Sequence, residues 1–186
     1  MALLFTSDTH FGHEGILKHS SRNFPDSFSM DGELVRRWNK KVKPDDTVYH
    51  LGDLSFKGVA YTADILEQLN GTIHWVLGNH DKALKGKAEI KARMASIQPL
   101  LELVLDGQHI VMCHYPMLTW NKAHYGAWML HGHSHGTLKH PYEGMRLMDV
   151  GVDTNHLTPY SLEDVRQYMQ GRGHTSVDHH ETKEGV

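Results

Sequence analysis

The stretch ALLFTSDTH, residues 2–10, decides the fold, because an apolar run changes abruptly into polar residues within it. A short apolar run bounded by polar residues is typical of a buried β-strand. Asp8, Thr9 and His10 follow this predicted strand directly. A carboxylate and an imidazole are therefore expected at the carboxyl end of the first strand.

Four later strands are expected to end in the same kind of residue. They are TVYHL (47–51), TIHWVLG (72–78), HIVMCH (109–114) and AWMLHGH (127–133). The polar residues at or just after their ends are Asp53, Asn79, His80, Asp81, His114, His131, His133 and His135. In open α/β sheets, the loops at the carboxyl ends of the strands form the binding crevice. We therefore expect residues far apart in the sequence to converge on one site.

Helices are expected between the strands of the first half. Apolar residues at helical spacing predict helices over 30–42, with Ser29 as its cap, and around 65–69. The basic segment 82–96 is also expected to be helical. Alternating strands and helices predict a largely parallel sheet.

The second half of the chain has a different pattern. Asp106 and Gly107 separate two apolar runs and predict a β-hairpin. A last helix is expected after Ser161, which forms a capping-box pattern with Asp164. The hairpin region indicates a second sheet packed on the first, so the class is α/β (α+β).

Length and composition narrow the class of protein. The chain has 186 residues, a net charge of −3 and one cysteine, Cys113. We expect one domain over residues 1–170 and a polar, flexible tail over 171–186. With no apolar run of about 18 residues and no signal-peptide pattern, we expect no membrane contact and a cytoplasmic location. The charge argues against an extended polyanion-binding surface but allows a small phosphate-bearing substrate.

The strand-end residues have the chemistry of metal ligands. The candidates are Asp8, His10, Asp53, Asn79, His114, His133 and His135. Asp8 and His10 are two residues apart, so an extended chain would point both to one face, and the same holds for His133 and His135. Imidazole and carboxylate ligands without thiolate suit Mn, Fe, Zn, Co or Ni. Seven ligands suit two ions that share a carboxylate, an arrangement used for displacement at phosphorus.

The motifs DTH (8–10), GD (52–53), GNHD (78–81), CH (113–114) and GHSH (132–135) occur in this order. With them the chain resembles the calcineurin-like metallophosphoesterases from residue 2 to about 157, in a compact bacterial and phage branch. The resemblance implies a two-sheet αββα sandwich and two divalent transition-metal ions, with manganese favoured over Fe, Zn, Ni or Co. It implies one metal ion on Asp8, His10, Asp53 and His135, and a second on Asp53, Asn79, His114 and His133.

The resemblance also implies roles for residues that do not bind metal. His80 would stabilise the charged transition state at the phosphate, and Asp81 would orient His80. His131 is expected to support the site without binding metal. His13, Arg22 and Tyr115 are candidate substrate contacts, with ordinary loop residues as the alternative. Asp149 stands where this branch would be expected to have asparagine.

The function implied is hydrolysis of phosphate esters by a metal-bridging hydroxide. The short chain has no obvious cap domain, and an open site tolerates diesters, so a phosphodiesterase is weakly favoured over a phosphatase. A nuclease is an alternative that the net charge disfavours. A non-catalytic metal-binding module is a further alternative, although no expected ligand is missing. The expected partner is a small phosphate ester, a nucleotide or a nucleic-acid end.

Overall fold

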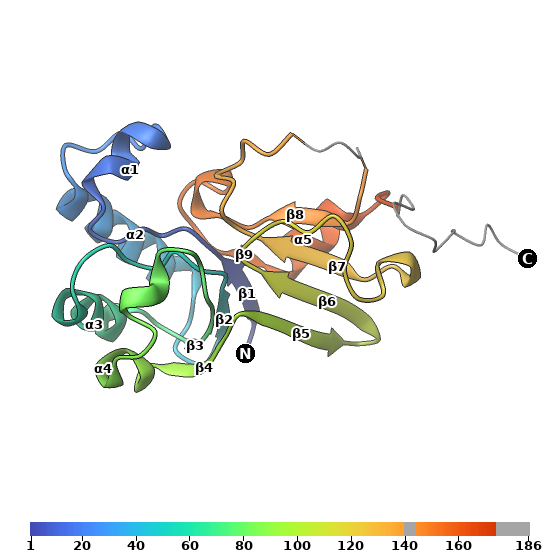
Figure 1. Ribbon diagram of the computed structural model, residues 1–186, viewed down its shortest axis with the longest axis horizontal. Coiled ribbons are helices and arrows are strands. Elements are labelled where there is room, and N and C mark those ends of the chain that lie inside the picture. The colour runs from blue at the N-terminus through green and yellow to red at the C-terminus, as the bar shows by residue number, and fades with distance from the viewer. Residues whose placement is uncertain (140–143, 174–186) are drawn as a thin grey trace, which may run out of the picture.

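The computed structural model describes residues 1–139 and 144–173, whose strands form two sheets (Figure 1). The first sheet has the order β4-β3-β2-β1-β9. Its strands are β1 (Leu3–Thr6), β2 (Thr47–His50), β3 (Thr72–Val76), β4 (Met94–Gln98) and β9 (Tyr160–Ser161). β1 to β4 are parallel and β9 is antiparallel to β1. The expected parallel sheet is confirmed.

The second sheet has the order β5-β6-β7-β8. Its strands are β5 (Leu100–Leu105), β6 (Gln108–Cys113), β7 (Trp128–His131) and β8 (Leu147–Asp149). β5 and β6 form the predicted hairpin, and Asp106 and Gly107 have positive φ angles of 50° and 83° at its turn. These φ angles match the twist that a two-residue hairpin needs.

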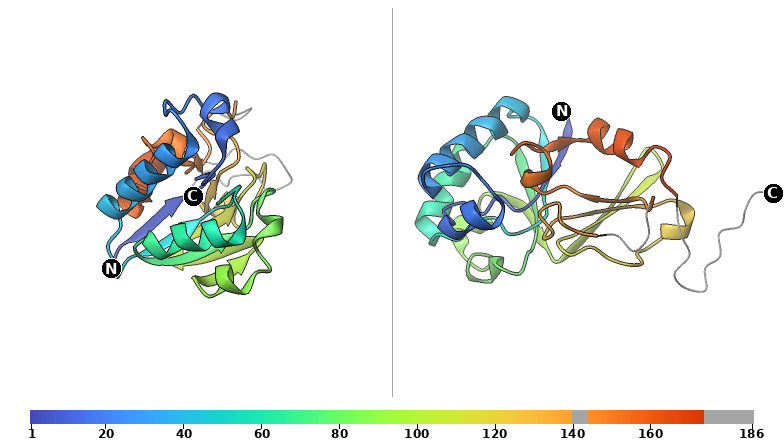
Figure 2. Two further views of the ribbon diagram at one scale, coloured as in Figure 1. Left: turned by 90° about the vertical axis from the view of Figure 1, so that its left-hand side faces the viewer. Right: turned by 90° about the horizontal axis from the view of Figure 1, so that it is seen from above.

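The helices α1 (Glu14–His19), α2 (Ser27–Lys41), α3 (Val59–Gln68) and α4 (Ala88–Lys91) gather on one side of the molecule (Figures 1 and 2). α2 and α3 cover one face of the first sheet, where Leu34 and Leu66 pack in one cluster with Leu4. The next residue of β1, Phe5, belongs to the cluster between the sheets. Successive side chains of a strand point to opposite faces, so β1 contributes to both cores.

The core between the sheets also receives the last helix. Met112 and Leu130 of the second sheet meet Phe5 there, with Val165 of α5 (Leu162–Met169). α5 begins at Ser161 with the predicted capping box. The other face of the second sheet is covered by a third cluster that includes Ala123 of the short helix η2 (Ala123–Tyr125). The two-sheet α/β class is therefore confirmed.

One expected helix is wrong. The segment 82–96 contains only the short helices η1 (Asp81–Ala83) and α4, and then enters strand β4. β4 pairs with the edge of β3, which satisfies backbone groups that a helix would have satisfied internally. The helix predicted over 30–42 starts earlier than expected, at Ser27, with Asp26 as its cap.

Within the described part of the chain, no helix has the length and apolar character needed to span a bilayer. The expected extent of the domain over 1–170 stays a prediction. Most of the expected tail, residues 174–186, lies outside the described residues.

Candidate metal centre

The carboxyl ends of strands from both sheets meet at one place. The amide of Asp8 donates to the carbonyl of Gly52 at 3.0 Å, and that of Gly132 donates to the carbonyl of His114 at 3.0 Å. Between the sheets, the amide of His133 donates to Oδ2 of Asp8 at 2.9 Å. These bonds connect the ends of β1 and β2 to those of β6 and β7, so the predicted convergence is found.

Five predicted ligands have a left-handed backbone. The φ angle is 57° at Asp8, 52° at His10, 54° at Asp53, 68° at His133 and 47° at His135. Residues other than glycine rarely adopt this conformation, and such strain concentrates at functional sites. The idea that an extended chain aligns each pair of ligands is therefore wrong. Tight turns bring these side chains together instead.

The predicted ligands form two clusters of potential metal-binding atoms. Such atoms lie within 4.8 Å of one another in the sets Asp8, His10, His135 and Asp53, His114, His133. Oδ2 of Asp53 lies 3.8 Å from Nε2 of His10 and 3.6 Å from Nε2 of His114. Oδ1 of Asn79 lies 2.9 Å from Nε2 of His114. All seven predicted ligands are thus together, with the Asp53 carboxylate between the clusters.

The first cluster has the unsatisfied atoms that a metal ion would need. Oδ1 of Asp8 and Nε2 of His10 are buried, and neither has a hydrogen-bond partner among the described residues. Leaving such an atom unsatisfied costs about 1–3 kcal/mol. With oxygen and nitrogen donors and no thiolate, the clusters fit divalent transition-metal ions. Binding of metal to these residues remains a prediction.

The ionisation of the first cluster also suits metal binding. Burial raises the pKa of Asp8, but the neighbouring imidazoles, His10 first, outweigh burial and bring this pKa to about 2. Burial lowers the pKa of His10. Both side chains are therefore held in the deprotonated forms that bind metal.

Two glycines, Gly132 and Gly78, leave the space that Asp8 and Asp53 occupy. A Cβ on Gly132 would lie 2.5 Å from Oδ2 of Asp8, and one on Gly78 would lie 2.5 Å from the amide nitrogen of Asp53. A larger residue at either position would displace an aspartate of the site.

Asp153, which no sequence pattern indicated as a site residue, supports the first cluster. Asp153 accepts hydrogen bonds from Nε and Nη2 of Arg22 at 2.7 and 2.8 Å, and its Oδ2 lies 2.6 Å from Nδ1 of His135. Burial lowers the pKa of His135, but Asp153 and Asp8 outweigh burial, so this pKa is raised. Bonding to Nδ1 leaves Nε2 of His135 to face the cluster. No spacing rule links Arg22 and Asp153, which are 131 positions apart.

Arg22 was expected to contact the substrate, but its side chain lies inside the protein. Its side chain is buried, and it also donates to the carbonyls of Asp8 at 2.7 Å and Thr9 at 2.9 Å. The guanidinium is thus engaged inside the protein, where it holds the turn that carries Asp8. This contradicts the expected contact, and we assign Arg22 a positioning role.

Asp81 also differs from its expected role. Its carboxylate accepts hydrogen bonds from the amides of Asp53 at 2.9 Å, Leu54 at 3.0 Å and Gly78 at 2.7 Å. No hydrogen bond from the His80 side chain to Asp81 is present among the described residues. Asp81 therefore fixes the backbone of Asp53 and not the ring of His80.

His80 lies at the open side of the site. Its side chain is 48% exposed, and its Nε2 lies 4.0 Å from Oδ2 of Asp53. The ring contacts Phe56, with centroids 4.6 Å apart. It belongs to neither cluster of potential metal-binding atoms. It is free to face a substrate bound at the clusters.

Two other predicted substrate contacts flank the clusters. The ring of His13 stacks on Phe56 with centroids 3.8 Å apart. Tyr115 is 47% exposed and lies edge-on to His133, with centroids 4.7 Å apart. Both side chains are near enough for substrate contact, which stays a prediction.

The supporting residues next to the strand ends are explained by hydrogen bonds. His131 is fully buried, and its Nδ1 lies 2.8 Å from the carbonyl oxygen of Gly132. Asp149 accepts from the amides of Gly136 and Gly151, both at 2.8 Å. The aspartate that replaces the expected asparagine thus fixes the loop after His135.

We expect Asp153→Asn to weaken metal binding by about 10- to 100-fold, because it removes the charge that orients His135. Calorimetric titration of the metal-free protein with Mn²⁺ measures this effect. Asp106→Asn is the matched control, since the side chain of Asp106 is 89% exposed. Equal affinities of wild type and Asp153→Asn would contradict the role of Asp153.

We expect the metal-free protein to lose stability in acid partly through His50. This buried residue lies with Nε2 3.0 Å from Oγ1 of Thr9, and burial lowers its pKa from 6.5 to about 3. In the unfolded chain His50 has a pKa of 6.5 and binds a proton below that pH, whereas in the folded protein it stays unprotonated down to about pH 3. The free energy of unfolding therefore falls as the pH drops from 6.5 towards 3. His50→Gln should remove roughly 2 kcal/mol of the loss between pH 6.5 and 5. Urea unfolding with chelator measures it, and identical pH slopes in both proteins would contradict it.

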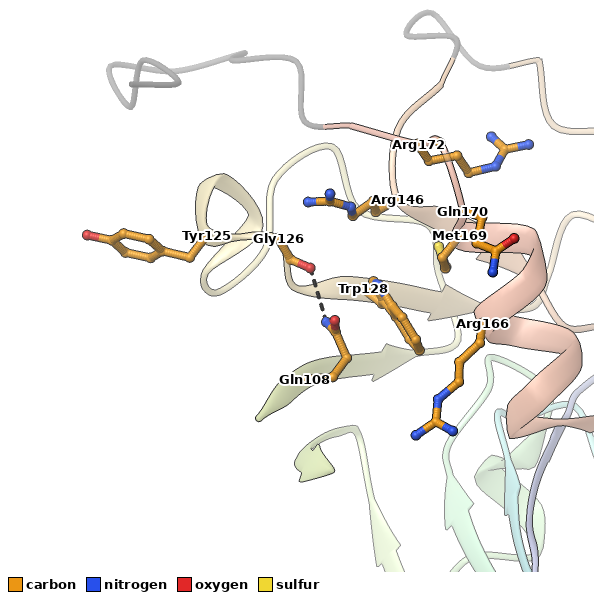
Figure 3. Close-up of a pocket in the computed structure, with 10 residues that line it drawn as sticks. Gln108, Tyr125, Gly126, Trp128, Arg146, Arg166, Met169, Gln170 and Arg172 are labelled. Carbon is orange, nitrogen blue, oxygen red and sulfur yellow. Dashed lines mark hydrogen bonds between the residues drawn. The ribbon is translucent and has the colours of Figure 1, made fainter. Parts of the chain in front are cut away.

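A separate hollow of about 390 Å³ lies at the opposite end of β7, around Trp128 (Figure 3). Arg146, Arg166 and Arg172 line it, but in Figure 3 their guanidinium groups point in different directions. None of the residues of the two metal-site clusters lines this hollow. This hollow is therefore separate from the candidate site.

Comparison with known proteins identifies the family. The sequence model of the calcineurin-like phosphoesterase superfamily domain matches residues 1–163, so the chain belongs to this superfamily. An uncharacterized protein of Methanocaldococcus jannaschii is 32% identical over 163 residues, covering 84% of this chain and 85% of that protein. The gene 66 protein of Mycobacterium phage D29 is 28% identical over 192 residues, covering 89% and 94%.

A solved structure shares the fold. The protein of unknown function AQ665 from Aquifex aeolicus superposes with a TM-score of 0.69 and 24% identity. The match covers 90% of this chain and 98% of that one. The expected family is confirmed, and members of this superfamily are typically metal-dependent phosphoesterases.

Proposed function

We propose that the chain is a phosphodiesterase that uses two divalent metal ions. The observation that carries this proposal is the position of Oδ2 of Asp53, 3.8 Å from His10 and 3.6 Å from His114. A carboxylate between two clusters of ligands suits a pair of ions about 3.5–4 Å apart. We expect manganese to support activity, with Fe, Zn, Ni and Co as alternatives.

The bound ions would supply an activated water and offset the negative charge of the phosphate. The chain supplies the positioning of these ions, through Asp153 on His135 and through Asp81 on the backbone of Asp53. His80, half exposed beside Asp53, is placed to stabilise negative charge on the phosphate or to protonate the leaving oxygen. Its exposure also leaves room for a substrate with two ester arms.

The test compares hydrolysis of bis-p-nitrophenyl phosphate with that of p-nitrophenyl phosphate. Protein stripped with chelator is reloaded with Mn²⁺, Ni²⁺, Zn²⁺ or Mg²⁺ before each assay. We expect a higher kcat/KM for the diester and no activity in the stripped protein. Faster hydrolysis of the monoester would favour a phosphatase, and no hydrolysis of either ester would contradict the proposal.

A further inference from the structure

A hollow of about 550 Å³ lies beside the two clusters and extends away from them. One wall comes from α1 and the residue after it, and the other from the segment that follows β7. The residues that line it are Ile16, His19, Ser20, His133, Ser134, His135, Thr137, Leu138 and Lys139. Its volume is in the range of small-molecule sites. α1 and the segment after β7 lie on the same side of the molecule (Figure 1).

The hollow opens onto both predicted metal sites. His135 belongs to the first cluster and His133 to the second, and both line the hollow. Oγ of Ser20 lies 3.2 Å from Nδ1 of His135, which joins the α1 wall to the first cluster. A substrate whose phosphate lies at the clusters would therefore extend one of its arms into this hollow.

The walls favour an arm that carries negative charge. Among the described residues no carboxylate lines the hollow, while Lys139 and His19 are exposed basic residues. Lys139 has no ion-pair partner among the described residues. An exposed ammonium attracts a phosphate group, and here it lies beside the predicted metal sites in a chain whose net charge is −3.

The hollow also has an apolar part. Ile16 is nearly buried, whereas Leu138 is 36% exposed. Apolar surface beside basic groups suits an organic moiety that lies between two phosphates.

We infer that this hollow binds the organic arm of a phosphodiester and selects arms that end in a second phosphate. Lys139 contacts that second phosphate, and Leu138 packs on the organic moiety. The inference rests on the proposed phosphodiesterase function and adds the class of substrate. Nucleotide-bearing diesters with a terminal phosphate have this chemistry.

The test uses two diesters that differ only in the second phosphate. They are thymidine 5′-(p-nitrophenyl phosphate) and its 3′-phosphorylated form, which release the same p-nitrophenolate. We expect wild type to have the higher kcat/KM for the phosphorylated form. Lys139→Gln should lower this preference about fivefold, since an exposed charge pair contributes up to about 1 kcal/mol. Lys40→Gln, which removes an exposed charge on α2, is the matched control and should leave the preference unchanged.

A second variant and a binding measurement complete the test. Leu138→Glu places a negative charge in the hollow and should lower the preference further than Lys139→Gln does. Calorimetry should show that Lys139→Gln binds thymidine 3′,5′-bisphosphate more weakly than wild type does. The affinities of the two proteins for thymidine 5′-phosphate should be equal.

The possible failures are distinguishable. If bis-p-nitrophenyl phosphate and both thymidine diesters are hydrolysed but neither variant changes the preference, the inference is overturned and the phosphodiesterase function stands. If no diester is hydrolysed, the proposed function itself fails.

Discussion

Replacing Asp53 by asparagine is expected to lower kcat by about 10³-fold or more. The carboxylate of Asp53 lies within 4 Å of the ring nitrogens of His10, His80 and His114, so one change affects both predicted metal sites. Asparagine keeps the size of the side chain but removes the charge that would bridge two cations. Loss of about 4 kcal/mol of transition-state stabilisation corresponds to this fall in rate.

Metal content and activity must be measured on the same sample of Asp53→Asn. We expect elemental analysis after dialysis to show fewer than two ions per chain, together with the loss of diester hydrolysis. Asp64→Asn, an exposed position on α3, is the control for the loss of one carboxylate. If Asp53→Asn kept its full metal content and turned over at the wild-type rate, the bridging role of Asp53 would be contradicted.

Replacing His80 by glutamine is expected to lower kcat by about 10²- to 10⁴-fold while the metal content stays unchanged. The ring of His80 belongs to neither cluster, yet it stands half exposed beside Asp53. It is therefore positioned to act on the substrate and not on the metal ions. Elemental analysis tests whether the metal content is unchanged, and steady-state kinetics measures the fall in kcat.

The choice of leaving group separates two roles of His80. If His80 protonates the leaving oxygen, the effect of His80→Gln should be larger for an alkyl ester than for a p-nitrophenyl ester, because p-nitrophenolate leaves without help. If His80 only stabilises charge on the phosphate, the two effects should be equal. A loss of metal in His80→Gln would contradict both roles.

Much of the fold could be predicted from local patterns. The hairpin at Asp106 and Gly107 and the cap at Ser161 were predicted correctly, because turns and helix ends depend on residues next to each other in the chain. The helix predicted over 82–96 was wrong, because strand β4 in this segment forms by pairing with β3. Strand preference depends more on tertiary context than helix preference does.

The sequence by itself determined the chemistry of the candidate site. The order of strands that end in Asp8, Asp53, Asn79, His114 and His133 supplies oxygen and nitrogen donors, and the carboxyl ends of parallel strands share one edge of a sheet. The tertiary structure alone decided how these residues are held. Asp81 on the backbone of Asp53, and Arg22 with Asp153 behind His135, are contacts that arise when the two sheets and their loops pack together. Such contacts join residues that no sequence periodicity relates, so only the packed fold shows them.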